Sequence, residues 1–115
     1  MITVSHEDGH ILAVVLGEFT VQDFRQFEEE ALYDIRQQGK ARMIMDLTGM
    51  AAYTIDMAVE EIRFLKQHRQ QFERVAIVSD DQWVTWSVWL NRMMTESEIE
   101  VFDDVADARS WIISE

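Results

Sequence analysis

The apolar residues of this chain change their spacing several times, and each spacing predicts one kind of element. Two mostly apolar runs, 1–6 (MITVSH) and 10–17 (HILAVVLG), flank the turn residues Glu7, Asp8 and Gly9. Two strand-like runs joined by a short turn of this composition predict an antiparallel hairpin. We expect its second strand to end at Gly17.

The next segment has the spacing of a helix. Thr20 is a good N-cap, and Asp23, three residues later, completes a capping-box-like arrangement. Gly39 suits the left-handed residue beyond the end of this helix. The residues expected to face the core are Phe24, Phe27, Ala31, Leu32 and Ile35.

Short apolar runs and helical segments then alternate. Strands are predicted at 42–47, 74–79 and 98–102, and a loop at 48–53. The run 74–79 has four consecutive apolar residues, which is typical of a strand covered by helices on both faces.

Three more helices follow from the same pattern. Thr54 is expected to cap the first of them, Asp80 or Asp81 the second, and the third spans 104–113. The core-facing residues of the first are predicted to be Ile55, Ala58, Val59, Ile62 and Leu65. Those of the last are predicted to be Val105, Ala108, Trp111 and Ile112.

The predicted order is β-β-α-β-α-β-α-β-α. Strands separated by single helices favour parallel pairing with right-handed crossovers, whereas the opening hairpin is antiparallel. The sequence therefore predicts an α/β fold with an open, mixed, mainly parallel sheet of five strands and four helices.

Composition narrows the functional classes. The chain has 115 residues, which predicts a single domain, and a formal net charge of −12. That charge repels nucleic-acid phosphates and anionic membranes, so we expect neither as a partner. The absence of cysteine excludes disulfides and thiolate metal sites. Because the longest apolar run, 11–16, is too short for a membrane span or a signal-peptide core, we expect a cytoplasmic protein.

Four phrases of the chain resemble the SpoIIAA-like branch of the STAS domains, which is related to bacterial anti-sigma-factor antagonists. They are GEFTVQDF (17–24), RMIMDLTG (42–49), FERVAIVSDDQW (72–83) and EIEVFDDVADARSWI (98–112). The resemblance implies a non-enzymatic protein-interaction or regulatory module. The family is also compared with CRAL-TRIO domains, which carry hydrophobic lipids, so the resemblance implies a carrier or sensor of an apolar ligand as the alternative.

STAS domains that act as phospho-switches carry a D-L-S-G-like phrase and then a D-S-S-G phrase with the acceptor serine. Here DLTGMAAYTIDMA (46–58) is similar to the first phrase and departs from the second. Asp56 falls at or beside the acceptor position, and Thr54 is the nearby hydroxyl. Asp56 is either a structural acid at a helix N-terminus, where the macrodipole favours it, or a mimic of permanent phosphorylation. In both cases we expect no serine phospho-switch.

Catalytic and metal-binding patterns are weak. His6, His10 and His68 lack a metal-ligand spacing, and no nucleophile-elbow, P-loop or dinucleotide-binding phrase occurs. Two strand-end acids, Asp46 and Asp80, suggest a magnesium site as one interpretation. The favoured interpretation is that Asp80 caps a helix and that Asp46 is an acid at the end of a strand, without a metal. We therefore expect no catalytic residues, metal or cofactor.

One helix is more apolar than a single buried face requires. Residues 83–94 (WVTWSVWLNRMM) hold three tryptophans within seven positions. A helix that is apolar on nearly all sides is expected to be covered on more than one side. The cover is a second subunit in a homodimer, a protein partner or an apolar ligand. The predicted surface consists of Trp83, Val84, Trp86, Val88, Trp89 and Met93.

Overall fold

The structure, a computed structural model, describes residues 1–7, 9–68, 70–81 and 98–114. Within these residues, five strands form one sheet in the order β1-β2-β3-β4-β5. They are β1 (Ile2–Glu7), β2 (His10–Phe19), β3 (Ala41–Tyr53), β4 (Phe72–Val78) and β5 (Glu98–Phe102). β1 and β2 pair antiparallel, and the other neighbours pair parallel. The predicted class, an α/β fold with an open, mainly parallel sheet, is confirmed.

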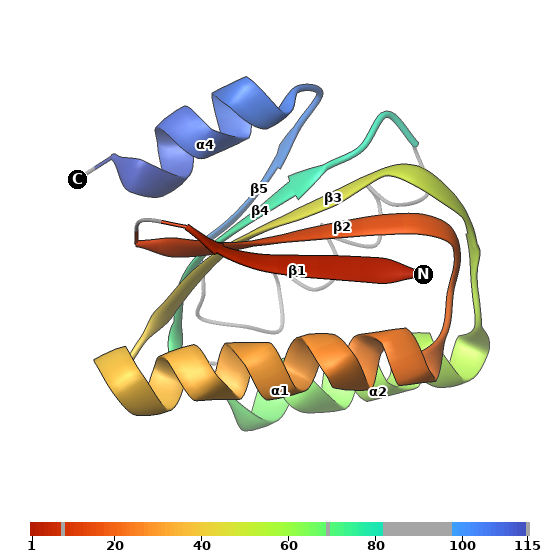
Figure 1. The fold of residues 1–115 in the computed structure, drawn as a ribbon, viewed down its shortest axis with the longest axis horizontal. Helices are drawn as coiled ribbons and strands as arrows, with labels where there is room; N and C mark the ends of the chain where they lie inside the picture. The colour runs from red at the N-terminus through yellow and green to blue at the C-terminus, as the bar shows by residue number, and fades with distance from the viewer. Residues whose placement is uncertain (8, 69, 82–97, 115) are drawn as a thin grey trace.

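Helices cover both faces of the sheet. α1 (Val21–Gln38) and α2 (Ile55–Gln67) lie on one face, and α4 (Val105–Ile113) lies on the other (Figure 1). The alternating burial of β4 reflects this arrangement: Val75 and Ile77 join the core under α1 and α2, whereas Ala76 and Val78 join the core under α4. The prediction that 74–79 is covered on both faces is therefore confirmed. The helix predicted at 83–94 lies outside the described residues.

The caps of α1 form as predicted. The Thr20 hydroxyl accepts a hydrogen bond from the Asp23 backbone N–H (3.2 Å), and Asp23 Oδ2 accepts one from the Thr20 N–H (3.1 Å). Gly39 ends the helix in the left-handed region, with φ 83°, and its N–H donates to the Ile35 carbonyl at 2.7 Å. Of the predicted core residues only Leu32 remains partly exposed.

Two strands run further than the sequence indicated, which corrects two predictions. β2 continues beyond Gly17 to Phe19, and β3 continues through the predicted loop to Tyr53. The two extensions pair with each other, so that Phe19 lies opposite Tyr53. Glycine and alanine are poor strand signals by themselves, but the parallel ladder satisfies their backbone groups in the folded chain.

Gly49 shows why this pairing needs a small residue. A Cβ atom at position 49 would lie 2.6 Å from Leu16 Cδ2 and 3.2 Å from the Val15 carbonyl oxygen. The register between β2 and β3 also shifts between Val14 and Leu16. The missing side chain therefore lets β3 lie against β2 where the ladder is irregular.

The orientation of α2 differs from the prediction. Met57 and Phe64 are its deeply buried residues, each 3% exposed, whereas Ile55, Val59 and Ile62 lie at the surface. The side chain of Leu65 is outside the described part of the structure. The Phe64 ring contacts the rings of Phe24 on α1 (5.8 Å between centroids) and of Phe72 on β4 (5.5 Å). This aromatic cluster sets the rotation of α2, because an aromatic side chain has more surface to bury than valine or isoleucine.

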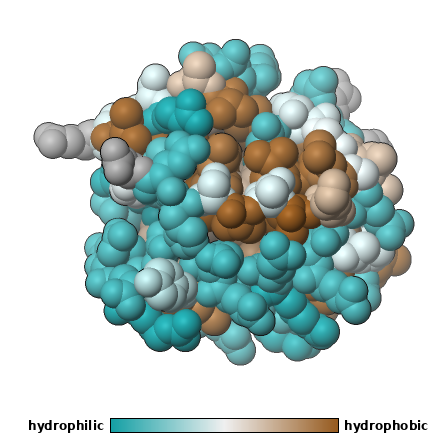
Figure 2. Space-filling view, viewed as in Figure 1, coloured by the Kyte–Doolittle hydropathy of each residue, from teal (hydrophilic) through white to brown (hydrophobic). Residues whose placement is uncertain are grey.

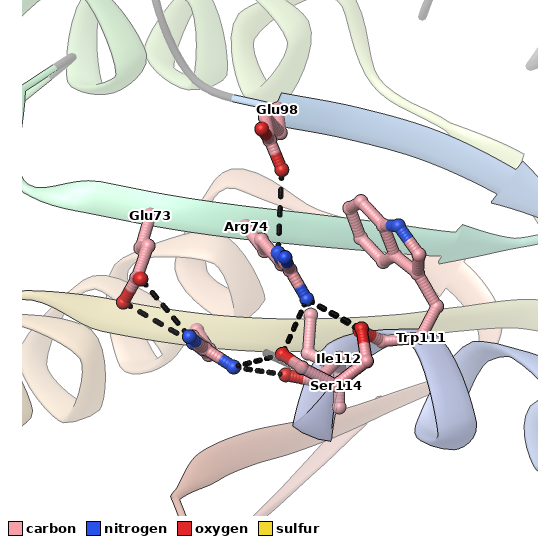
Figure 3. A network of polar contacts seen from close by, with 7 residues as sticks. Glu73, Arg74, Glu98, Trp111, Ile112 and Ser114 are labelled. Atoms are coloured by element: carbon pink, nitrogen blue, oxygen red, sulfur yellow. Dashed lines mark hydrogen bonds and ion pairs between the residues drawn. The ribbon is translucent and has the colours of Figure 1, made fainter.

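Two arginines hold the end of α4 against the sheet. Arg74 on β4 donates to the carbonyls of Trp111 (2.8 Å) and Ser114 (2.7 Å). It also pairs with Glu98 on β5 and lies 5.3 Å from the centroid of the Trp111 ring (Figure 3). Arg42 on β3 donates to the carbonyl of Ile112 (2.7 Å). These contacts satisfy carbonyls that a helix C-terminus leaves without intrahelical partners.

Candidate functional site

The candidate site lies where β3 passes into α2. The Thr54 N–H donates to the Phe19 carbonyl (3.2 Å), which ties the start of α2 to the end of β2. The Thr54 hydroxyl accepts from the Met57 N–H (3.3 Å), so the predicted N-cap role of Thr54 is confirmed. The first turn of α2 is thereby fixed relative to the sheet.

Asp56 is exposed in this first turn. Its Oδ1 accepts a hydrogen bond from the Met57 N–H at 3.0 Å. A hydrogen bond with the Thr54 hydroxyl lowers the pKa of Asp56 below its ordinary value. A negative charge at this end of a helix is also favoured by the macrodipole. Asp56 thus presents an ionised carboxylate to solvent at the start of α2.

The D-L-T-G motif forms hydrogen bonds within itself. Asp46 Oδ1 accepts from the backbone N–H of Thr48 (3.0 Å) and from its hydroxyl (2.7 Å). At the end of β4, Ser79 is buried, and its hydroxyl accepts from the Asp81 N–H at 3.1 Å. Among the described residues, no three His, Asp or Glu side chains converge as metal ligands. Asp46 and Asp80 therefore belong to no three-ligand cluster within the described residues.

An apolar strip lies beside Asp56. It consists of Tyr53 at the end of β3 and of Ile55, Val59 and Ile62 on α2, and we call it the α2 stripe. The exposed fractions of these four residues are 48%, 82%, 51% and 41%. The spacing from Ile55 to Ile62 is that of one helix face. This face was predicted to be core, and in the structure it is open to solvent.

Two carboxyl groups lie close together where α1 packs against α2, in the seam between the two helices. The partly buried side chains of Glu28 on α1 and Glu60 on α2 hydrogen bond to each other. Burial, together with this hydrogen bond, raises the pKa of Glu28 to about 7. Glu28 Oε1 is buried and has no hydrogen-bond partner within the described residues. Glu60 also lies 3.6 Å from Arg63 Nη1.

This contact could not be predicted from the sequence, because a run of acids such as Glu28, Glu29 and Glu30 is typical of a solvated helix face. Glu30 is also engaged, because its Oε2 lies 2.5 Å from His6 Nε2. His6 Nδ1 lies 3.0 Å from Asp34 Oδ1, and the contact with Glu30 raises the pKa of His6. A run of acids carries no sequence signal for such pairs, since they depend on which elements pack together.

The remaining histidines have structural partners. His10 is buried, with Nε2 3.2 Å from Glu7 Oε2, and Arg109 of α4 lies 3.4 Å from the same oxygen. His68 Nδ1 lies 2.6 Å from Gln71 Oε1. Each of the three histidines therefore has its own contacts, separate from those of the other two.

One cavity of about 270 Å³ opens at the other end of the sheet. Its lining includes the charged side chains of Lys40, Arg42 and Glu73 together with Ile112 and Ile113. An apolar ligand needs a mainly hydrophobic lining, so this cavity does not suit one. The residues predicted to line an apolar surface, Trp83, Val84, Trp86, Val88, Trp89 and Met93, lie outside the described residues. No described helix is long and apolar enough to cross a membrane.

Comparison with known proteins gives one family match. The model of the SpoIIAA-like family matches residues 11–113, which is most of the chain. No functionally curated protein matches.

Solved structures share the fold at low sequence identity. An uncharacterized protein with a SpoIIAA-like fold from Shewanella loihica PV-4 superposes with a TM-score of 0.78 at 19% identity, over 97% of this chain and 92% of that one. The anti-sigma factor antagonist SpoIIAA in its unphosphorylated form gives 0.68 at 9% identity, over 100% of both chains. An anti-sigma factor antagonist from Mycobacterium paratuberculosis gives 0.63 at 10% identity, over 99% and 94%. Identities this low show the fold alone.

Proposed function

Because this chain belongs to the SpoIIAA-like family, we propose that it is a non-enzymatic module that binds a protein partner through the α2 stripe. The observation that carries the proposal is the open apolar face formed by Ile55, Val59 and Ile62. Isolated apolar residues are normal on a protein surface, but a contiguous set on one helix face marks an interaction site. A partner with an apolar groove or helix face fits such a stripe.

The chemistry around the α2 stripe supports binding rather than switching by phosphate. The Thr54 hydroxyl is engaged by the Met57 N–H and by Asp56, and Asp56 itself has no group that accepts a phosphate. A carboxylate carries one charge, whereas a phosphoserine carries nearly two. We infer that Asp56 gives the start of α2 a constant negative charge, and that the partner interaction does not depend on a kinase acting there.

The proposal can be tested by site-specific crosslinking in the native cells. A photo-crosslinking residue at Val59 is expected to capture one protein, whereas the same residue at exposed Glu29 on α1 is expected not to capture it. The purified partner should then bind Val59→Asp at least about tenfold more weakly than the wild type, a loss of about 1.4 kcal/mol or more. Equal capture from both positions, or undiminished binding by Val59→Asp, would contradict the proposal.

The alternative function, a carrier or sensor of an apolar ligand, depends on the tryptophan-rich segment 83–94. We keep it as the competing proposal. We rank it second, because the cavity described above has a charged lining that suits polar contents. Native mass spectrometry of the protein purified from its own cells separates the two. A retained lipid-like mass supports the carrier, and a bare chain that binds a protein partner supports the interaction module.

A further inference from the structure

One edge of the sheet presents unpaired backbone groups. β1 is the first strand of the sheet and pairs with β2 alone among the described strands. Met1 and Leu16 exchange two backbone hydrogen bonds, at 2.8 and 3.0 Å. In an antiparallel ladder such pairs recur every second residue, so Thr3, Ser5 and Glu7 also bond toward β2. The N–H and C=O groups of Ile2, Val4 and His6 therefore point away from the sheet.

The side chains along this edge are apolar or neutral at its centre. Thr3 and Ser5 are exposed, and Val4 packs partly against the main core. With β1 in front, Figure 2 shows a band of apolar and neutral residues over the strands, bordered by the hydrophilic surface of α1. Natural edge strands are commonly blocked by proline, by lysine or by a bulge. The centre of β1 carries none of these.

We propose that β1 pairs antiparallel with β1 of a second copy of this chain, with Val4 on the two-fold axis. This register places Ile2 opposite His6 and Val4 opposite Val4, so all three outward-facing residues find a hydrogen-bonded partner. Thr3 then lies beside Ser5 of the second copy, which brings no like charges together. The result is one continuous sheet across a self-complementary, two-fold interface. The inference does not depend on the proposed function.

The interface extends beyond the strand itself. A stable interface covers roughly 800 Å² on each partner, which is more than one short strand offers. Further surface is available on both sides of β1. On the α1 side, Tyr33 is 53% exposed and contacts His6 edge-on. On the opposite side, Leu16 is 45% exposed, and α4 packs only over β3, β4 and β5 among the element pairs with substantial contact.

The charge of the chain is compatible with pairing at the centre of this edge. Each chain carries −12, so two copies repel each other at long range. Their contact must therefore be made where charges are few, and the Thr3–Ser5 segment meets this condition. Added salt screens the repulsion and should tighten the dimer.

The test is sedimentation of the full chain at low and high salt, combined with amide hydrogen exchange. The wild type is expected to be a dimer that tightens with salt. The amides of Val4 and His6, which face outward, should become protected as the concentration rises. The amides of Thr3 and Ser5 should be protected at all concentrations, because they bond to β2. This alternation distinguishes edge pairing from any other dimer contact.

A double variant, Thr3→Lys with Ser5→Lys, places like charges opposite each other across the proposed axis. It should weaken the dimer at least about tenfold, although it lowers the repulsive net charge. The matched control, Gln67→Lys with Gln70→Lys, makes the same charge change at exposed positions at and beyond the end of α2 and should leave the dimer intact. Circular dichroism checks that both variants fold.

Three results would overturn the proposal. The first is a wild-type monomer at every concentration and salt level. The second is an undiminished dimer in the Thr3, Ser5 lysine variant. The third is a dimer that dissociates on Val84→Asp while Val4 and His6 never gain protection, which would place the contact on the tryptophan-rich segment instead.

Discussion

The carboxyl groups of Glu28 on α1 and Glu60 on α2 hydrogen bond to each other across the seam between the two helices. Two carboxylates cannot form such a bond unless one of them holds a proton. Arg25 and Arg63 act on Glu28 in the opposite direction, but burial and Glu60 dominate and raise the pKa of Glu28 to about 7. The packing of α2, and with it the α2 stripe, is therefore linked to a proton that titrates near neutral pH.

The first prediction is a loss of stability as the pH rises through 7. The unfolded chain releases the Glu28 proton near the ordinary glutamate pKa of 4.5, whereas the folded chain keeps it until about 7. The stabilisation is fully present below the lower value and is lost as the pH passes the higher one. Urea denaturation should show the loss in the wild type and a clearly smaller one in Glu28→Gln.

The exposed neighbour Glu29 provides the control, because Glu29→Gln should keep the wild-type pH dependence. A residual slope in Glu28→Gln is expected from Glu61, whose pKa is also raised to about 7 by burial, although part of this side chain reaches the surface. An unchanged slope in Glu28→Gln would show that the Glu28–Glu60 contact does not control the titration.

The second prediction concerns the two faces of α2. Phe64→Ala removes the ring that packs against Phe24 and Phe72 and should cost about 3–5 kcal/mol of folding free energy. Val59→Ser changes a solvent-exposed position and should stay within about 0.5 kcal/mol of the wild type. Chemical denaturation measures both. A large cost for Val59→Ser would mean that the α2 stripe is covered within the chain itself.

The third prediction concerns the start of α2. Thr54→Ala removes the hydroxyl that accepts from the Met57 N–H and should destabilise the protein by about 1 kcal/mol. Thr54→Ser keeps that oxygen and should restore most of the loss. The test is the free energy of unfolding of the wild type, Thr54→Ala and Thr54→Ser, measured by chemical denaturation. Equal stabilities would show that the cap contributes nothing.

The fourth prediction is that no kinase phosphorylates the start of α2. Incubation with cellular kinases and ATP, followed by phosphosite mapping, should find no stoichiometric phosphate at Thr48 or Thr54. Both hydroxyls are engaged, Thr48 by Asp46 and Thr54 as the cap. Stoichiometric phosphate on either residue would restore the phospho-switch interpretation of the D-L-T-G phrase.

The fifth prediction concerns the arginine contacts that hold α4. Arg74→Met keeps most of the aliphatic stem and removes the bonds to the Trp111 and Ser114 carbonyls, so it should cost about 1–3 kcal/mol. Amide exchange in α4 should accelerate. The control is Arg109→Met on α4 itself, which loses a half-exposed contact with Glu7 and should change stability by less than about 1 kcal/mol. Equal effects would contradict a special role for Arg74.

Local signals in the sequence were sufficient for much of the fold. The capping box of Thr20 and Asp23, the left-handed Gly39 and the cap at Thr54 all form as expected. Each depends on residues within one turn of each other, so the chain carries the information locally. The doubly buried strand at 74–79 was recognisable for a related reason, since its apolar run leaves no polar face.

The tertiary structure alone decided which face of α2 is buried. Ile55, Val59 and Ile62 form as good an apolar stripe as Met57 and Phe64, and helical periodicity cannot rank two such stripes. The choice follows from the partners that the fold supplies, above all the rings of Phe24 and Phe72, which come from distant parts of the chain.

The extension of β3 to Tyr53 and the Glu28–Glu60 contact have the same origin. The first needs the backbone of β2, and the second needs α2 to lie against α1. Spacing along the chain indicates which segments become helices and strands, because the apolar period reflects the local geometry of each element. Burial, pKa and exposed surface depend on long-range contacts, which exist only once the elements have packed.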